Sequence, residues 1–128
     1  MQTNDTMANQ PVDTDETSTL ISSSKVDGTA VYDPTGDRIG SIDSVMIEKR
    51  SGQVNYAVLS FGGFLGMGNS YHPLPWKALK YDTGLGGYVV DVDRGRLENS
   101  PSYGADESPD WADRSYGRRI DDYYGYGL

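Results

Sequence analysis

Short runs of alternating apolar and polar residues fill the middle of the chain. The clearest run, QVNYAVLSF over residues 53–61, places Ala57, Leu59 and Phe61 on one face of an extended strand. The other face of this run is also fairly apolar, which is typical of a strand covered on both sides. The pattern therefore predicts a buried strand over residues 53–61.

A second apolar run, over residues 38–48, has irregular spacing. Apolar positions follow one another every third residue from Ile39 to Val45 and then two residues apart at Ile47. One long bent strand with a bulge near residues 40–43 explains this slip. An amphipathic helix is the alternative, which the β-branched residues and the glycine within the run disfavour.

Turn-forming residues separate these runs from their neighbours. Asp33-Pro34-Thr35-Gly36 fits a type I turn after a short strand at 29–32, and a polar turn at 49–52 joins the two long strands as an antiparallel pair. Five or six short strands with glycine-rich turns predict an all-β fold, a small antiparallel β-barrel or sandwich. The remaining expected elements are extended pieces at 70–73, 80–82 and 88–91, a helical turn at 75–80, and a turn at 94–99 capped by Asp93 with Leu97 inward.

The two ends of the chain differ from the middle in composition. Residues 1–24 carry four acidic side chains and no lysine or arginine, and residues 101–128 carry six acids, three arginines and five of the ten tyrosines. Neither end has an aliphatic stripe, so we expect disordered tails around a domain at 25–100. The alternative for the C-terminal segment is ordering on a partner, with tyrosines as anchors.

Charge and rare residues exclude several functions. The net charge is 11 − 19 = −8, which argues against nucleic acid as a main partner. The absence of cysteine excludes disulfides, thiolate nucleophiles and cysteine-based metal sites. No stretch has the pattern of a signal peptide or a transmembrane helix, so we expect a cytoplasmic protein.

The candidate catalytic side chains are few, and each has a structural interpretation. His72, the one histidine, is expected to be a packed and hydrogen-bonded residue. Asp91 and Asp93 are expected to form a solvated cluster with nearby arginines, and the Asp33 and Asp37 pair lacks the other ligands of a calcium loop. We therefore predict no enzyme activity, no catalytic residue, no metal and no cofactor.

A glycine-rich loop at 62–69 lacks the lysine and the following helix of a phosphate-binding loop. Its apolar side chains are unusual for a solvated loop and point to a contact surface. Trp76 is expected either to fill the core or to take part in recognition. The predicted interaction surface consists of Phe64, Leu65, Met67, Tyr71 and Trp76.

The order and spacing of these segments resemble the PRC-barrel family. The features that carry the likeness are V-Y-D-x-x-G-D-R-I-G at 31–40, I-D-S-V-x-I-E at 42–48, S-G-Q-V-x-Y-A-V-L at 51–59, G-G-F-L-G at 62–66 and H-P-L-P-W-x-A-L at 72–79. This family includes the cytoplasmic barrel of the photosynthetic reaction-centre H subunit and the C-terminal barrel of a ribosome-maturation factor. Stand-alone barrels of this size resemble bacterial members of unassigned role.

The resemblance implies a six-stranded barrel that serves as an interaction or assembly module and not as an enzyme. An unidentified protein partner follows from it, with a homodimer and peripheral association with a membrane complex as open alternatives. The reaction-centre relative influences proton and electron transfer to quinone. By analogy, the alternative function is that of a small-molecule-binding or electron-transfer accessory protein at a membrane complex.

Overall fold

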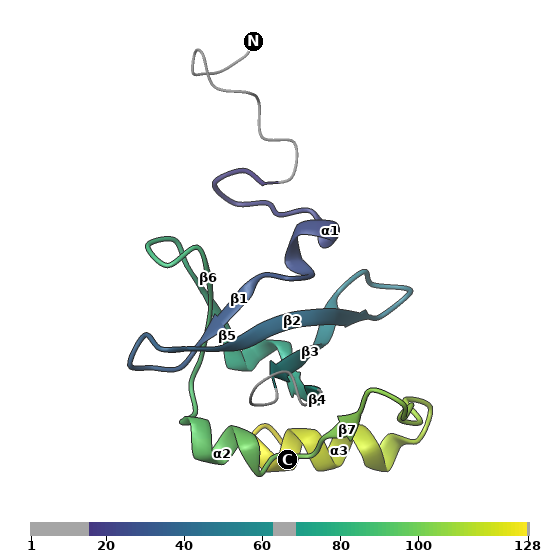
Figure 1. Ribbon diagram of the computed structural model, residues 1–128. Helices are drawn as coiled ribbons and strands as arrows, with labels where there is room; N and C mark the ends of the chain where they lie inside the picture. Colours follow the sequence, from purple (N-terminus) through teal and green to yellow (C-terminus); the bar gives the residue numbers. More distant parts are fainter. Residues whose placement is uncertain (1–15, 63–68, 128) are drawn as a thin grey trace, which may run out of the picture.

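The computed structural model describes residues 16–62 and 69–127, within which seven strands form one sheet in the order β5-β6-β1-β2-β3-β4-β7 (Figure 1). The strands are β1 (Ala30–Tyr32), β2 (Arg38–Ile47), β3 (Val54–Gly62), β4 (Asn69–Pro75), β5 (Leu79–Asp82), β6 (Gly87–Val90) and β7 (Tyr103–Gly104). The helical elements are α1 (Ser23–Val26), the 3-10 turn η2 (Trp76–Ala78), α2 (Arg94–Glu98) and α3 (Arg114–Tyr123). The predicted all-β class with short helical turns is confirmed, and α3 adds a longer helix.

The strand pairing follows the predicted meander from β1 to β4 and then departs from it. β5 and β6 form the expected hairpin, but β6 returns beside β1 in parallel, with Val31 opposite Tyr88. The prediction of an entirely antiparallel sheet is therefore wrong for the pair of β1 and β6. After β4, the turn η2 leads the chain to the β5–β6 hairpin, which lies on the other side of β1. β5 and β7 remain as the two edges of the sheet, so the barrel is approximate and its pairing does not close.

The bulge predicted in β2 is present. The register between β2 and β3 shifts between Ile42 and Ser44, as it does where one strand holds an extra residue. Close contact between the same strands also explains why residue 40 is a glycine. A Cβ at Gly40 would lie 2.3 Å from the carbonyl oxygen of Ser60, so a larger residue would push the strands apart.

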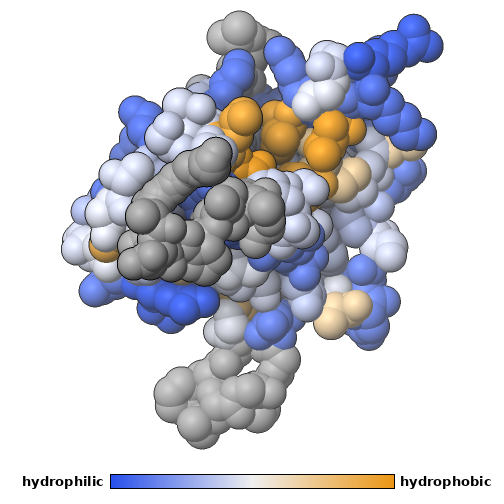
Figure 2. Space-filling view, turned by 90° about the horizontal axis from the view of Figure 1, so that it is seen from above, coloured by the Kyte–Doolittle hydropathy of each residue, from blue (hydrophilic) through white to orange (hydrophobic). Residues whose placement is uncertain are grey.

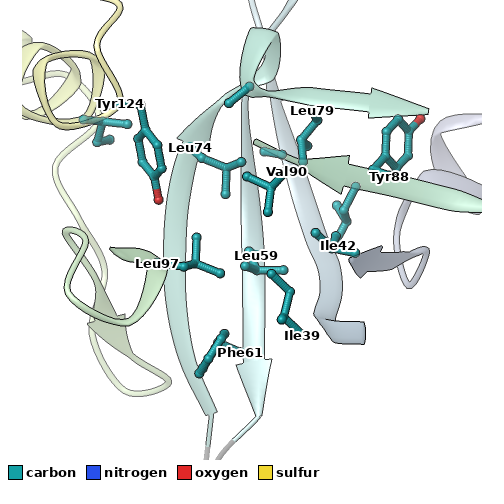
Figure 3. Close-up of a cluster of buried hydrophobic side chains, with 14 of the residues drawn as sticks. Ile39, Ile42, Leu59, Phe61, Leu74, Leu79, Tyr88, Val90, Leu97 and Tyr124 are labelled. Carbon is teal, nitrogen blue, oxygen red and sulfur yellow. The ribbon is translucent and has the colours of Figure 1, made fainter. Parts of the chain in front are cut away.

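One apolar cluster fills the space that the curled sheet encloses. Figure 3 shows Leu59 and Leu74 in its middle, with Tyr88 and Tyr124 at opposite sides of the view. Leu97 of α2 points inward, as expected from the capped turn. The buried apolar members are Val26, Val31, Ile39, Ile42, Ala57, Leu59, Phe61, Leu74, Ala78, Leu79, Tyr88, Val90, Leu97, Ile120 and Tyr124.

The C-terminal segment is ordered in the structure, which corrects the expectation of a disordered tail. α3 begins after Asp113, whose carboxylate accepts a hydrogen bond from the Ser115 amide at 2.9 Å. Ile120 is 0% exposed and Tyr124 is 9% exposed, so both belong to the core. Two buried side chains are too few to form a recognisable apolar pattern in the sequence, yet they pack the helix against the sheet.

The N-terminal segment is described only from Glu16 onward, so most of its predicted disorder lies outside the described residues. Glu16 and Ile21 form an isolated antiparallel bridge, and α1 begins after Ser22. Ile21 packs against the core, whereas Leu20 is 72% exposed. In Figure 1, α1 lies on one side of the sheet, and α2 and α3 lie on the other.

Across the described residues, no helix has the length and apolar character that crossing a bilayer needs.

Candidate interaction surfaces

Strand β4 separates two members of the predicted interaction surface. Tyr71 lies near its start, and Trp76 follows directly after its end. Extended strands rise about 3.3 Å per residue, so these two residues stand roughly 16 Å apart along the strand. The structure therefore places them in two different surroundings. The other three members, Phe64, Leu65 and Met67, lie outside the described residues.

The first surrounding is the end of the β3–β4 hairpin. Gly62 pairs with Asn69 across the two strands and so closes the connection between them. Two residues further along β4, Tyr71 is in register with Tyr103 of β7, and their rings stack with centroids 5.6 Å apart and planes at 22°. Both rings are half-buried. Burial, with smaller contributions from Tyr116, Asp43 and Tyr71, raises the pKa of Tyr103.

Proline protects the rest of this edge of the sheet. β7 pairs with β4 at Ser70 and Tyr71 alone. Beyond them, Pro73 and Pro75 have no N–H to offer to another strand. Residues 72–75 of β4 are also buried, so this part of the strand is not an edge onto which a partner could add a strand.

The second surrounding is a group of three aromatic rings beside a cavity. Trp76 meets Tyr88 edge to face at a centroid distance of 5.3 Å, and Tyr88 meets Tyr81 in the same manner at 5.1 Å. These rings line a cavity of about 350 Å³ together with Leu79 and residues 16–21. Trp76 therefore both packs against the core and faces this cavity.

Sequence reasoning did not single out Tyr81, Tyr88 or Glu16. The signal that was available is the hairpin register, which sets Tyr81 opposite Tyr88 on β5 and β6. No sequence pattern identifies Glu16 as part of this cavity, because its position depends on how the segment before α1 folds back. Its carboxylate accepts a hydrogen bond from the Tyr81 hydroxyl at 2.8 Å and forms an ion pair with Lys25 at 2.9 Å. Donation to this carboxylate is the main cause that raises the pKa of Tyr81.

His72 is a buried structural histidine, as predicted. Its ring is 2% exposed, its Nε2 lies 2.8 Å from the Ser70 hydroxyl, and its Nδ1 lies 2.8 Å from the Ser100 hydroxyl. Ser100 donates its single proton to the carbonyl of Leu97, so it must accept from Nδ1–H. Nε2 is then the acceptor for Ser70. This chain of hydrogen bonds fastens the end of α2 to β4, and burial lowers the pKa of His72.

Two of the carboxylates weighed in the sequence, Asp33 and Asp93, serve local structure. Asp93 caps α2 by accepting from the Arg96 amide at 2.7 Å, whereas Asp91 is exposed. Asp33 accepts from the hydroxyl of Thr35 at 2.6 Å and from two backbone amides, and the Thr35 hydroxyl is the largest cause that lowers its pKa. Within residues 16–62 and 69–127, no three histidine or carboxylate side chains gather as metal ligands would.

The C-terminal helix adds a polar contact that composition did not suggest. The Tyr56 hydroxyl donates to the Asp121 carboxylate, at 3.1 and 3.2 Å from its two oxygens. Burial, strengthened by this carboxylate, raises the pKa of Tyr56 to about 12. Trp111 packs against the same tyrosine at a centroid distance of 5.5 Å. One tyrosine of β3 thus joins the sheet to α3 and to the segment before it.

A curled sheet with a short helical turn between its fourth and fifth strands defines a small β-barrel module. A family model of the PRC-barrel domain matches residues 18–97, which is more than half of the chain. The chain therefore belongs to the PRC-barrel domain family, and the resemblance noted in the sequence is confirmed. None of the curated proteins compared with the chain matches it. The match ends at Leu97, so β7 and α3 lie outside it.

Proposed function

We propose that this chain is a non-catalytic module for protein interaction or assembly, and that it binds its partner at the end of the β3–β4 hairpin. The observation that carries this proposal is the stack of Tyr71 on Tyr103 at the edge of the sheet. Half-buried tyrosine rings offer a large apolar surface with a polar tip, which is typical of residues at protein interfaces. The loop with Phe64, Leu65 and Met67 joins the same two strands.

A second apolar surface supports the proposal that this protein binds a partner. Figure 2 views the molecule from the side opposite α2 and α3 and shows apolar side chains gathered within a mostly polar face. The described chain also exposes Leu20 at 72% and Ile47 at 49%. Apolar patches rimmed by polar residues are typical of sites of contact with another protein. A second copy of this chain is one occupant that such a surface could take.

The test is affinity capture from a native lysate, membranes included, with the full chain as bait. The baits are the wild type, the Phe64→Ser/Leu65→Ser double variant, the Tyr71→Ser variant and a Tyr126→Ser control at the opposite end of strands β3 and β4. We expect a partner retained by the wild type and the control and lost by the two hairpin variants, identified by mass spectrometry. Equal capture by all four baits, or recovery of nothing but the bait, would contradict the proposal. Light scattering on the same proteins measures whether the chain dimerises.

A second candidate function, binding of a small molecule, is favoured by the cavity beside Trp76. At about 350 Å³, the cavity falls near the lower end of small-molecule sites, which span about 300–1,000 Å³. The finer alternative, an accessory role in electron transfer at a membrane complex, rests on analogy with the reaction-centre relative. A cytoplasmic location likewise stays a prediction.

A further inference from the structure

The cavity beside Trp76 combines aromatic walls with a negative charge. Tyr88 meets both Trp76 and Tyr81 at steep angles, 61° and 75°, so the three rings form differently oriented walls and not one flat stack. The face of an aromatic ring carries partial negative charge and attracts cations, most strongly in tryptophan. All three side chains line the same cavity, but Tyr88 is only 4% exposed, so Trp76 and Tyr81 offer most of the ring surface that a bound cation can contact.

The opposite wall supplies one carboxylate, that of Glu16, which is paired with Lys25. Residues 16–21 fold back across the cavity through the bridge between Glu16 and Ile21. The Glu16 carboxylate is held there by the Tyr81 hydroxyl and by Lys25. The ion pair with Lys25 is partly exposed, with side-chain exposures of 41% and 21%, and pairs of that kind are worth little. A cation bound in the cavity would share this carboxylate with Tyr81 and Lys25.

We propose that this cavity binds a small organic cation of the quaternary ammonium class. Such a cation has no N–H, so it needs no hydrogen-bond acceptors and loses little by leaving water for a cavity with aromatic walls. Its methyl groups pack against Trp76, Tyr81 and Leu79, and its charge is balanced by Glu16.

The test is titration of the full chain with choline and with 3,3-dimethylbutan-1-ol, a neutral molecule of the same shape. Isothermal calorimetry and the indole fluorescence of the tryptophans give the two dissociation constants. We expect choline to bind at least about tenfold more tightly than the neutral alcohol, because the faces of the aromatic rings attract its positive charge. Equal affinity for the two molecules, or no saturable binding of choline, would overturn the proposal.

Variants at exposed positions test the walls without disturbing the core. Tyr81 is 39% exposed, so Tyr81→Leu should fold while weakening choline by roughly tenfold. Tyr126 is 43% exposed and does not line this cavity, so Tyr126→Leu is the matched control and should bind choline as the wild type does. If Tyr81→Leu and Tyr126→Leu bind choline equally well, the aromatic site is refuted.

Charge variants test the role of Glu16. We expect Glu16→Gln to weaken choline and Lys25→Met to tighten it, because Lys25 competes for the same carboxylate. The opposite pattern would contradict this role. Vesicles of phosphatidylcholine distinguish a free solute from a lipid headgroup. If the protein adsorbs to the vesicles and choline displaces it, the ligand is the headgroup. If the protein binds choline but does not adsorb to the vesicles, the ligand is the free solute. This site goes beyond the proposed hairpin surface, so Tyr81→Leu should leave partner capture unchanged.

Discussion

The strands and the C-terminal segment reach the same core by different routes. β3 enters it through alternating apolar positions such as Leu59, which is 1% exposed. The C-terminal segment enters through Ile120 and Tyr124, the two residues of the segment that are buried in the core. Around these two, α3 is polar, and the other tyrosines of the segment are at most partly buried: Tyr116 packs against Trp111, and Tyr123 lies beside Arg96.

This difference shows where sequence patterns lose their power. A strand repeats its apolar positions, so several residues report the same buried face. α3 has ten residues and one fully buried aliphatic side chain, so its order depends on the tertiary contacts that it makes. The Arg96 side chain of α2 donates to the Tyr123 carbonyl of α3, and the Tyr123 hydroxyl donates to the Arg96 carbonyl. The sequence of neither segment predicts this contact.

The largest expected effect compares one buried residue from each region. Ile120→Ala and Leu59→Ala should each lower the free energy of unfolding by about 2–5 kcal/mol, the usual cost of removing a buried aliphatic side chain. Urea unfolding followed by tryptophan fluorescence measures both. Leu20→Ala is the control, since Leu20 is 72% exposed and its loss should change stability little. A cost for Ile120→Ala as small as for Leu20→Ala would show that α3 adds nothing to the core.

The next effect concerns the hydrogen bond between the two regions. Tyr56→Phe keeps the ring against Trp111 but removes the donor to Asp121, so it should cost about 1–2 kcal/mol. Asp121→Asn keeps an acceptor and should cost less. The double variant measures the coupling between the two side chains, and strict additivity of the single effects would contradict a direct contact.

A smaller effect is expected at the start of α3. Asp113 accepts from both the amide and the hydroxyl of Ser115, and these hydrogen bonds lower its pKa. Asp113→Ala should therefore cost about 1 kcal/mol, whereas Asp113→Asn, which preserves the cap, should cost much less. Thermal unfolding by circular dichroism measures the difference. Equal melting temperatures for the two variants would contradict the cap.

The smallest effect is a pH dependence that comes from His72. Burial holds the folded-state pKa of His72 below its ordinary value, so the unfolded chain binds this proton first as the pH falls. Stability should therefore decrease as the pH drops below about 6.5 and level off below the folded-state pKa. NMR titration of the imidazole measures the folded-state pKa directly, because the chain has one histidine. A midpoint at or above the ordinary value would contradict the buried, neutral ring.

Much of the strand framework could be predicted from the sequence, because its signals are local. The turn at Asp33, the bulge near Asp43 and the cap at Asp93 each follow from residue chemistry within a few positions. The parallel pairing of β1 with β6 could not be predicted, since it joins residues far apart in the chain. The cavity at Trp76 was missed for the same reason: Glu16, Trp76 and Tyr88 meet there only after folding.

The surfaces left open to a partner depend on whether the C-terminal segment stays docked on the sheet. Native-state hydrogen exchange on the full chain tests this docking most directly, amide by amide. If α3 belongs to the core, the amide of Tyr124, which donates to the Ile120 carbonyl, should be protected to a degree approaching that of the β3 amides. Exchange throughout residues 114–124 at the rate of a free peptide, beside a protected β3, would contradict it.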